Sequence, residues 1–137
     1  MAVRKSQRSV SKTEFLTQLR DYAKTFLLYQ NSCPVKFRHY VENNMLRYST
    51  SAYTHAMIGN SIQPRDGDEV KERRRQMLTA RAHIYSVISQ LEVFYEAYKS
   101  DALSNRQIEQ MSDKGKEIIK LLNGVIDSDR QRYKNIR

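Results

Sequence analysis

The sequence feature that most constrains the fold is the scarcity of residues that break helices. The 137 residues include only four glycines and two prolines, and the stretch that opens at Pro34 continues without a breaker as far as Gly59. No run of alternating β-branched residues indicates a strand. The sequence therefore predicts an all-α protein, long enough to bury one core as a single domain without a metal or a disulfide.

Two amphipathic helices are predicted in the first half of the chain. The first begins at Ser11, which can form a capping box with Glu14, and ends by Ser32. The second begins at Pro34, because proline suits the first turn of a helix, and it ends at Gly59-Asn60, where we expect left-handed backbone.

Two more helices are predicted in the second half. The third starts near Asp68, after a turn with strong turn residues, and continues for about 30 residues, or roughly 45 Å. The fourth starts at Ser104, with Gln107 completing a second capping box.

Short connections between long amphipathic helices favour antiparallel neighbours, and so predict an up-down-up-down four-helix bundle. We expect the bundle to span residues 11–130, after a basic, disordered arm at 1–10 and before a basic tail at 131–137. The apolar stripes are wide enough to predict a further buried face between subunits.

The formal net charge of +9 is large for a chain of this size and predicts a polyanionic partner. Part of the third helix's basic cluster has a local explanation, because Glu69 precedes Arg73 at a favourable spacing. Two interpretations of this basic cluster stay open, namely a salt-bridged face and a site that binds phosphate. The candidate contacts for nucleic acid or a partner are Lys36, Arg38, Arg47, Lys71, Arg73, Arg74, Arg75, Arg81, Arg130 and Arg132.

No residue pattern predicts catalysis, a cofactor or a metal. His39 and His55 lie about 160° apart on one helix, and His83 stands alone. The chain has no Gly-rich phosphate loop and no nucleophile elbow. We expect a protein that is not an enzyme and has no small-molecule substrate.

The tyrosines divide into two groups. Tyr22, Tyr48, Tyr95 and Tyr98 recur on apolar stripes, which predicts a place in the core or a subunit interface. Tyr29, Tyr53 and Tyr133 are freer to touch a partner.

Cysteine content and hydropathy predict a cytoplasmic protein. The single cysteine, Cys33, gives no reason to invoke an oxidising compartment. The longest apolar run is far short of the roughly 20 residues needed to cross a bilayer.

Four features, in order along the chain, resemble a known family. The second helix opens with Pro34, Lys36 and Arg38 and closes with Gly59-Asn60; the third carries Ala80 or Ala82 beside Leu78; the fourth follows Ser104 to Gln107 and ends near Leu122-Asn123-Gly124. This order is similar to that of the small four-helix-bundle family which includes the Avd accessory protein of diversity-generating retroelements and the proteins encoded in intervening sequences of bacterial large-subunit ribosomal RNA genes. The likeness covers residues 13–128. Gly59 and Val125 depart from it, since many relatives have Ala and Trp there.

The resemblance implies a function. It implies a homo-oligomeric, pentameric ring or barrel that associates with a reverse transcriptase and its template RNA, and with DNA, and that supports mutagenic cDNA synthesis without doing chemistry. Two alternatives stay open. One is an intervening-sequence-type bundle of uncertain role, and the other is a helical protein-protein adaptor whose basic face meets an acidic protein.

Overall fold

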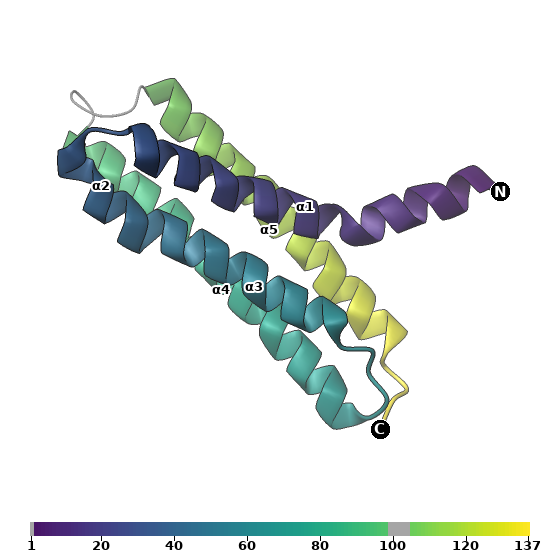
Figure 1. Ribbon diagram of the computed structural model, residues 1–137. Coiled ribbons are helices and arrows are strands. Elements are labelled where there is room, and N and C mark those ends of the chain that lie inside the picture. Colours follow the sequence, from purple (N-terminus) through teal and green to yellow (C-terminus); the bar gives the residue numbers. More distant parts are fainter. Residues whose placement is uncertain (1, 99–104) are drawn as a thin grey trace.

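The computed structural model describes residues 2–98 and 105–137, with side chains described from 13 to 98 and from 106 to 137. All regular structure in these residues is helical, which confirms the all-α prediction. The elements are α1 (Ala2–Ser32), α2 (Val35–Val41), the π-helix η1 (Glu42–Leu46), α3 (Arg47–Ser61), α4 (Gly67–Tyr98) and α5 (Asn105–Arg132). Because α2, η1 and α3 follow one another directly, four helical rods pack together (Figure 1).

Each rod has two neighbours among the described residues. α4 packs most extensively on α3 and then on α5, while α1 lies against α3 and α5. No close backbone approach joins α1 to α4 or α3 to α5 in the described part of the chain, so these pairs are diagonal. Figure 1 places the α3–α4 loop and the C-terminus at one end of the molecule and α2 at the other.

The core is built from the apolar rows that the sequence displays at three- and four-residue steps. Every rod contributes side chains with less than one per cent of their surface exposed. They are Leu19, Phe26, Val41, Met45, Ala52, Ala56, Met77, Ala80, Ile84, Val87, Leu91, Ile118 and Leu122.

One of the predicted helix starts changes in the structure, while the start of α4 at Gly67 agrees with the prediction near Asp68. α1 begins at Ala2, so Ser11 lies inside the helix and its capping box with Glu14 does not open it. α4 does open with a capping arrangement, in which Asp66 Oδ1 accepts the amide N–H of Glu69 at 2.9 Å and the Glu69 carboxylate accepts the N–H of Arg65 at 2.9 Å. The capping box predicted at Ser104 lies outside the described residues.

The predicted end of the second helix is wrong in its geometry. No described residue has a positive φ, and the helix continues through Gly59 and Asn60 until Ile62 turns to extended backbone. Gly59 serves packing instead, because a Cβ there would lie 3.1 Å from Gln76 Cβ and 3.1 Å from Met77 Cε. The glycine lets α3 approach α4 closely.

The π-helix η1 keeps one row of buried side chains in line. Phe37, Val41, Met45 and Ser49 are all buried at steps of four residues. In a regular α-helix each such step overshoots a full turn by about 40°. The wider turn, in which the N–H of Arg47 bonds to the carbonyl of Glu42, absorbs this drift.

Gly115 allows three helices to meet. A Cβ at this position would lie 2.8 Å from Ile88 Cγ1 of α4 and 2.8 Å from Tyr22 Oη of α1. The Tyr22 hydroxyl donates to the carbonyl of Met111 at 2.8 Å, so it is held in place. Added volume at residue 115 therefore meets a group that cannot move freely.

We expect Gly115→Ala to lower the free energy of unfolding by about 1–3 kcal/mol, because it overpacks this junction. The matched control is Gly124→Ala, since nothing lies within 4 Å of a Cβ at Gly124; it should raise the stability by about 0.5–1 kcal/mol through helix propensity. Urea unfolding of both variants measures the difference. Equal effects would contradict the crowding at Gly115.

Candidate nucleic-acid interface

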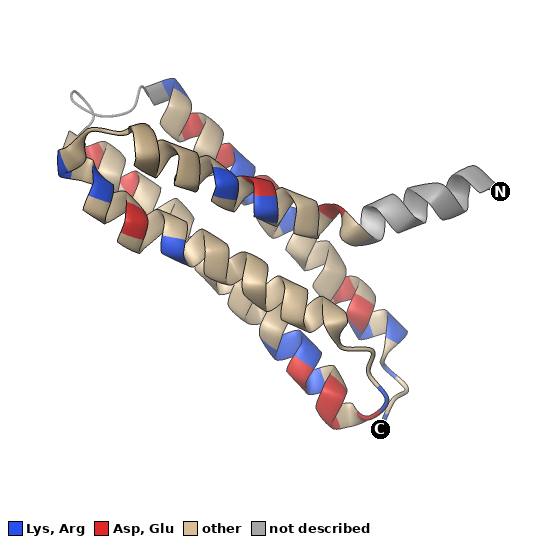
Figure 2. Cartoon of the chain, viewed as in Figure 1, with Lys and Arg blue, Asp and Glu red and all other residues tan. Residues whose placement is uncertain are grey.

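One end of the bundle brings together basic residues that are far apart in the sequence. The first turns of α4 carry Lys71 and Arg74, and the last turn of α5 carries Arg130 and Arg132. Figure 2 shows Lys and Arg on both segments near the C-terminus, interspersed with acidic residues. Arg74 and Arg130 border the same shallow depression between the two helices.

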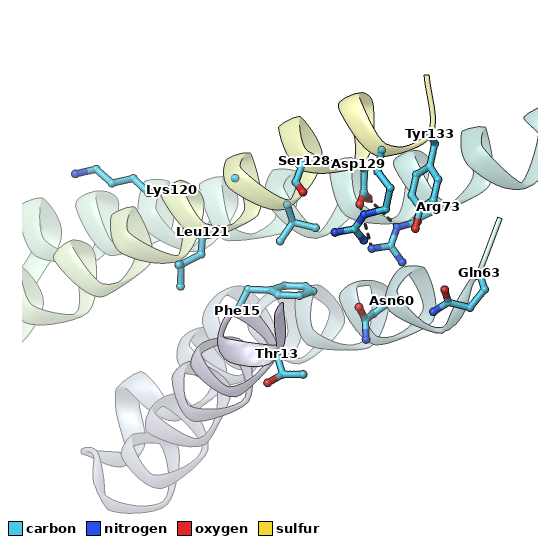
Figure 3. A pocket seen from close by; sticks show the side chains of 13 residues that line it. Thr13, Phe15, Asn60, Gln63, Arg73, Lys120, Leu121, Ser128, Asp129 and Tyr133 are labelled. Atoms are coloured by element: carbon cyan, nitrogen blue, oxygen red, sulfur yellow. Dashed lines mark hydrogen bonds and ion pairs between the residues drawn. The ribbon is translucent and has the colours of Figure 1, made fainter. Parts of the chain in front are cut away.

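A hollow with polar walls lies beside this basic end, and Figure 3 shows it from close by. Its volume is about 540 Å³. α1, α3, α4 and α5 all contribute to its walls, with Phe15 from α1 beneath the polar groups. The lining residues are Thr13, Phe15, Asn60, Gln63, Arg73, Lys120, Leu121, Gly124, Val125, Ser128, Asp129, Arg132 and Tyr133.

Arg73 holds one wall of the hollow together. Its guanidinium forms a two-pronged ion pair with Asp129, with Nε–Oδ2 at 2.7 Å and Nη2–Oδ1 at 3.2 Å. Nη1 donates to the carbonyls of Gly59 at 3.1 Å and Ile62 at 3.2 Å. The side chain is only 6% exposed and all three of its nitrogens are engaged, so it joins α3, α4 and α5 and is not available to a phosphate.

Tyr133 is flanked by two arginines at the mouth of the hollow. The guanidinium carbons of Arg73 and Arg132 both lie 5.8 Å from the centre of the tyrosine ring. Arg132 is exposed while Arg73 is buried, so only Arg132 presents its charge to solvent. The tyrosine ring is half-buried and forms part of the surface that a ligand would touch.

The other predicted residues of α4 have individual environments. Arg75 pairs with Glu72 at 2.7 Å, and its hydrogen bond, with one from Gln76, lowers the pKa of the Glu72 carboxyl to about 2. Arg81 Nη1 donates to Asn123 Oδ1 at 2.8 Å on α5. Arg75 is exposed and Arg81 half-buried, so both charges are partly engaged by the protein's own side chains.

Three predicted residues lie away from the basic end. Lys36 and Arg38 are on α2 at the opposite end of the molecule, where Lys36 Nζ sits 4.9 Å from the centre of the Phe37 ring. Arg47, at the start of α3, lines a separate groove against α1. The structure therefore places the predicted site residues in separate regions of the bundle.

Sequence reasoning missed several residues of the hollow, among them Lys120, Gly124 and Ser128. They precede the predicted Arg132 at four-residue steps, so each is a neighbour of the next along α5. Because each step turns by about 40°, this spacing alone does not place Lys120 and Arg132 on one face. The sequence gives no sign that Asn60 and Gln63 belong to the hollow. They reach it because α3 packs on α4, which in turn packs on α5.

His83 does not stand alone, contrary to the sequence interpretation. Its ring centre lies 5.5 Å from that of His55 and 5.4 Å from that of Tyr48, on the seam between α3 and α4. His55 Nδ1 is 2.6 Å from Gln76 Oε1, and the Gln76 amide donates to Glu72. Burial, and then the charge of His55, lower the pKa of His83.

The described residues offer neither a metal site nor a membrane span. Within residues 13–98 and 106–137, no three His, Cys, Asp or Glu side chains gather in a way that would hold a metal ion. None of the described helices combines the length and the apolar character that crossing a bilayer requires.

No protein-family model, curated protein or solved structure matches the chain. The assignment of function therefore rests on the geometry of this interface and on the sequence resemblance.

We expect Arg73→Met to lower the free energy of unfolding by about 3 kcal/mol, because it leaves the Asp129 carboxylate without its cation. Arg74→Met is the matched control, since Arg74 is exposed one residue away and should change stability by less than about 0.5 kcal/mol. Thermal or urea unfolding would measure both. A small effect at Arg73 would mean that the ion pair is not structural.

The histidine seam predicts a loss of stability in acid. Because the pKa of folded His83 is lowered, the unfolded chain binds the proton more readily, and the free energy of unfolding should fall as pH drops below about 6.5. His83→Gln should remove this part of the pH dependence. Unfolding curves recorded at several pH values, for wild type and variant, would test it, and parallel profiles would contradict it.

Proposed function

We propose that this chain is a non-catalytic nucleic-acid-binding accessory protein that holds RNA, and also DNA, at the α4–α5 end of its bundle. By resemblance to the Avd family, we further propose that it serves a diversity-generating retroelement. In that role it would associate in the cytoplasm with the reverse transcriptase and template RNA to support mutagenic cDNA synthesis.

The observation that carries the proposal is the convergence of Lys71, Arg74, Arg130 and Arg132 beside a hollow that also takes in Lys120. Arg73 is left out of the proposed interface, because Asp129 and two carbonyls already occupy its nitrogens. The remaining cations can neutralise phosphates without breaking an interaction that the fold needs.

The residues that line the hollow favour a single strand over a duplex. Lys120 and Arg132 are twelve residues apart on α5, or about 18 Å along the helix, so they can follow several successive phosphates. Tyr133 lies at the same edge and offers a ring on which a base can stack. Cations along a groove with an aromatic ring are typical of proteins that bind single strands without sequence preference.

We also propose that the four rods follow an up-down-up-down order and that the bundle assembles into a homo-oligomeric, pentameric ring, as the resemblance implies. A ring would repeat the basic end of each subunit around its axis. Such repetition strengthens the binding of one long strand, because each further binding event becomes intramolecular.

We expect Arg74→Glu combined with Arg132→Glu to weaken binding to a fluorescently labelled single-stranded RNA. The slope of log affinity against log salt should become shallower by about one for each phosphate that the variant no longer neutralises. Fluorescence anisotropy over a salt series measures both quantities. If an assembly neutralises ~6–10 phosphates, wild-type affinity should fall by about 10³–10⁵ between 50 and 200 mM salt.

The matched control is Lys36→Glu combined with Arg38→Glu, which changes the charge equally at the other end of the bundle. It should keep the wild-type slope. If both pairs weaken binding equally, general charge and not this interface governs affinity. Binding that ignores salt would overturn the nucleic-acid proposal.

The retroelement role needs a separate experiment. We would express the tagged protein together with its neighbouring genomic region and identify the protein and RNA that copurify at moderate salt. Recovery of a reverse transcriptase with a discrete structured RNA supports the role. Recovery of the protein without either would favour the intervening-sequence or adaptor alternative.

A further inference from the structure

A cationic groove lies on the α1–α3 side of the bundle, away from the basic end. Ala23 and Leu27 of α1 and Leu46 of η1 form its apolar floor, and Leu27 is 47% exposed. We call the groove, with its charged edges, the receptor groove. Its edge residues are Arg20, Lys24, Glu42, Asn43, Arg47 and Thr50.

The outer face of α3 continues this surface without any charge. After Arg47, no Lys, Arg, Asp or Glu occurs on α3, and Figure 2 draws the helix in tan along this length. Met57 and Ile58 are 45% and 43% exposed there. In a chain of net charge +9, a solvent-facing helix with no ionic side chain is typical of a face that another protein covers.

A second surface of opposite chemistry lies on α4, which is diagonal to α1. Leu78, Ala82, Tyr85, Ser89 and Glu92 are all exposed and recur at steps of four, three, four and three residues. This is the spacing of a seam that packs against another helix. Because the buried rows of α4 already face α3 and α5, its outer row has no covering element among the described residues.

The outer row of α4 becomes acidic toward its end. Tyr85 and Val93 are 52% and 56% exposed, and Glu92 shares the rim of a neighbouring hollow with Glu109 of α5. We call Tyr85, Glu92, Val93 and Glu109 the acidic ridge. Its apolar and negative groups complement the apolar floor and positive edges of the receptor groove.

The two surfaces stand at the same level along the bundle. Tyr48 lies beside His83, so the groove edge at Arg47 is level with the ridge near Tyr85. Tyr22 of α1 and Ile88 of α4 both lie against Gly115, so these two residues are level along the bundle axis. Lys24 follows Tyr22 by about half a turn of α1 and is therefore level with the ridge near Glu92. Two copies placed side by side without an axial shift would therefore bring groove and ridge together.

We propose that the acidic ridge of one copy of this chain docks in the receptor groove of the next. The inference rests on the self-association included in the proposed function and specifies the two faces that make it. Each copy presents a groove and a ridge on different sides, so the interface is heterologous and passes from subunit to subunit, as the closure of a ring requires.

The apolar groups and the charges have different tasks in this interface. Burial of Leu27, Tyr85 and Val93 supplies the driving force, because exposed ion pairs contribute little on their own. Lys24 and Arg47 facing Glu92 select the partner and fix the register. Reversing the charges should therefore abolish the association by repulsion, and reversing both sides should restore it.

The test is the solution mass measured by light scattering after gel filtration at about 0.15 M salt. Wild type should have a mass of at least three times the 16.2 kDa chain, since a heterologous interface cannot close with two copies. Lys24→Glu with Arg47→Glu, and separately Glu92→Lys with Glu109→Lys, should each run at 16.2 kDa. A chain that carries all four substitutions has a reversed groove and a reversed ridge, so each contact is complementary again and this variant should recover the wild-type mass.

Lys36→Glu with Arg38→Glu is the matched control and should keep the wild-type mass, because neither residue belongs to the groove or the ridge. Circular dichroism establishes that all variants are folded. If wild type is monomeric, or if an acidic helical peptide binds the groove of a monomer, the second-copy assignment is overturned. If the oligomer survives both reversals, or the variant with all four substitutions fails to recover it, the interface is wrong.

These failures can be told apart from failure of the proposed function. Arg74 and Arg132 are intact in all of these variants, so anisotropy with an RNA short enough for one subunit to hold reports the nucleic-acid interface separately from the assembly. An oligomer that persists through both reversals would leave the ring in place and remove only these two faces.

Discussion

The buried guanidinium of Arg73 is the interaction on which the basic end of the molecule depends. It neutralises Asp129 of α5 and donates to two carbonyls from the end of α3, where the backbone groups have no partner within the helix. Removing charges from water is costly, and the cost is offset here because the guanidinium donates to a carboxylate and to two carbonyls at once. Three helix ends are thereby locked into one wall, on which the exposed cations can be presented.

Much of the fold could be predicted from the sequence, because periodicity reports directly on burial. Apolar residues at three- and four-residue steps, among them Ala52 and Ala56 of α3 and Ile84 and Leu91 of α4, are fully buried. Tyr98, which the sequence places on the same kind of stripe, is 39% exposed. The error at Gly59 has a physical cause: a glycine near a helix end can supply left-handed backbone or close packing, and only the neighbouring helix decides which. The start of α1 was misplaced because Ser11 and Glu14 fit a capping pattern equally well inside a helix.

The candidate site was less accessible to sequence reasoning, because charge alone does not reveal its position. Arg73 and Arg74 look equivalent in the sequence, yet one is buried in an ion pair and the other is exposed. Consecutive residues of a helix point in different directions around its axis, and on α4 it is Arg73 that points toward Asp129. Lys120 lies about 120° around α5 from Arg132, so spacing alone did not reveal that both line the hollow. The contribution of Gln63 depends on a loop whose path the sequence does not encode locally.

The net charge of +9 thus divides into separate functions. One arginine stabilises the fold, a group at the α4–α5 end forms the proposed nucleic-acid interface, and another group edges the groove that we propose for a neighbouring subunit. Since the last two surfaces lie on different parts of the bundle, occupation of one leaves the other accessible. An assembly could form first and then take up a strand.

The π turn at Glu42–Leu46 determines how this helix tolerates change in length. It holds one residue more than a regular turn would, and the wider turn takes up this residue while the buried row stays in line. Deleting a single residue within the turn would convert it to ordinary helix. Phe37 and Ser49 would then be separated by nearly three regular turns, so Val35–Val41 would keep about the same phase relative to α3. Phe37 would stay against the Phe94 and Tyr98 rings that it now packs against. The turn is therefore the point at which this helix can lose a residue without turning the aromatic cluster at one end of the bundle relative to the close glycine packing at the other.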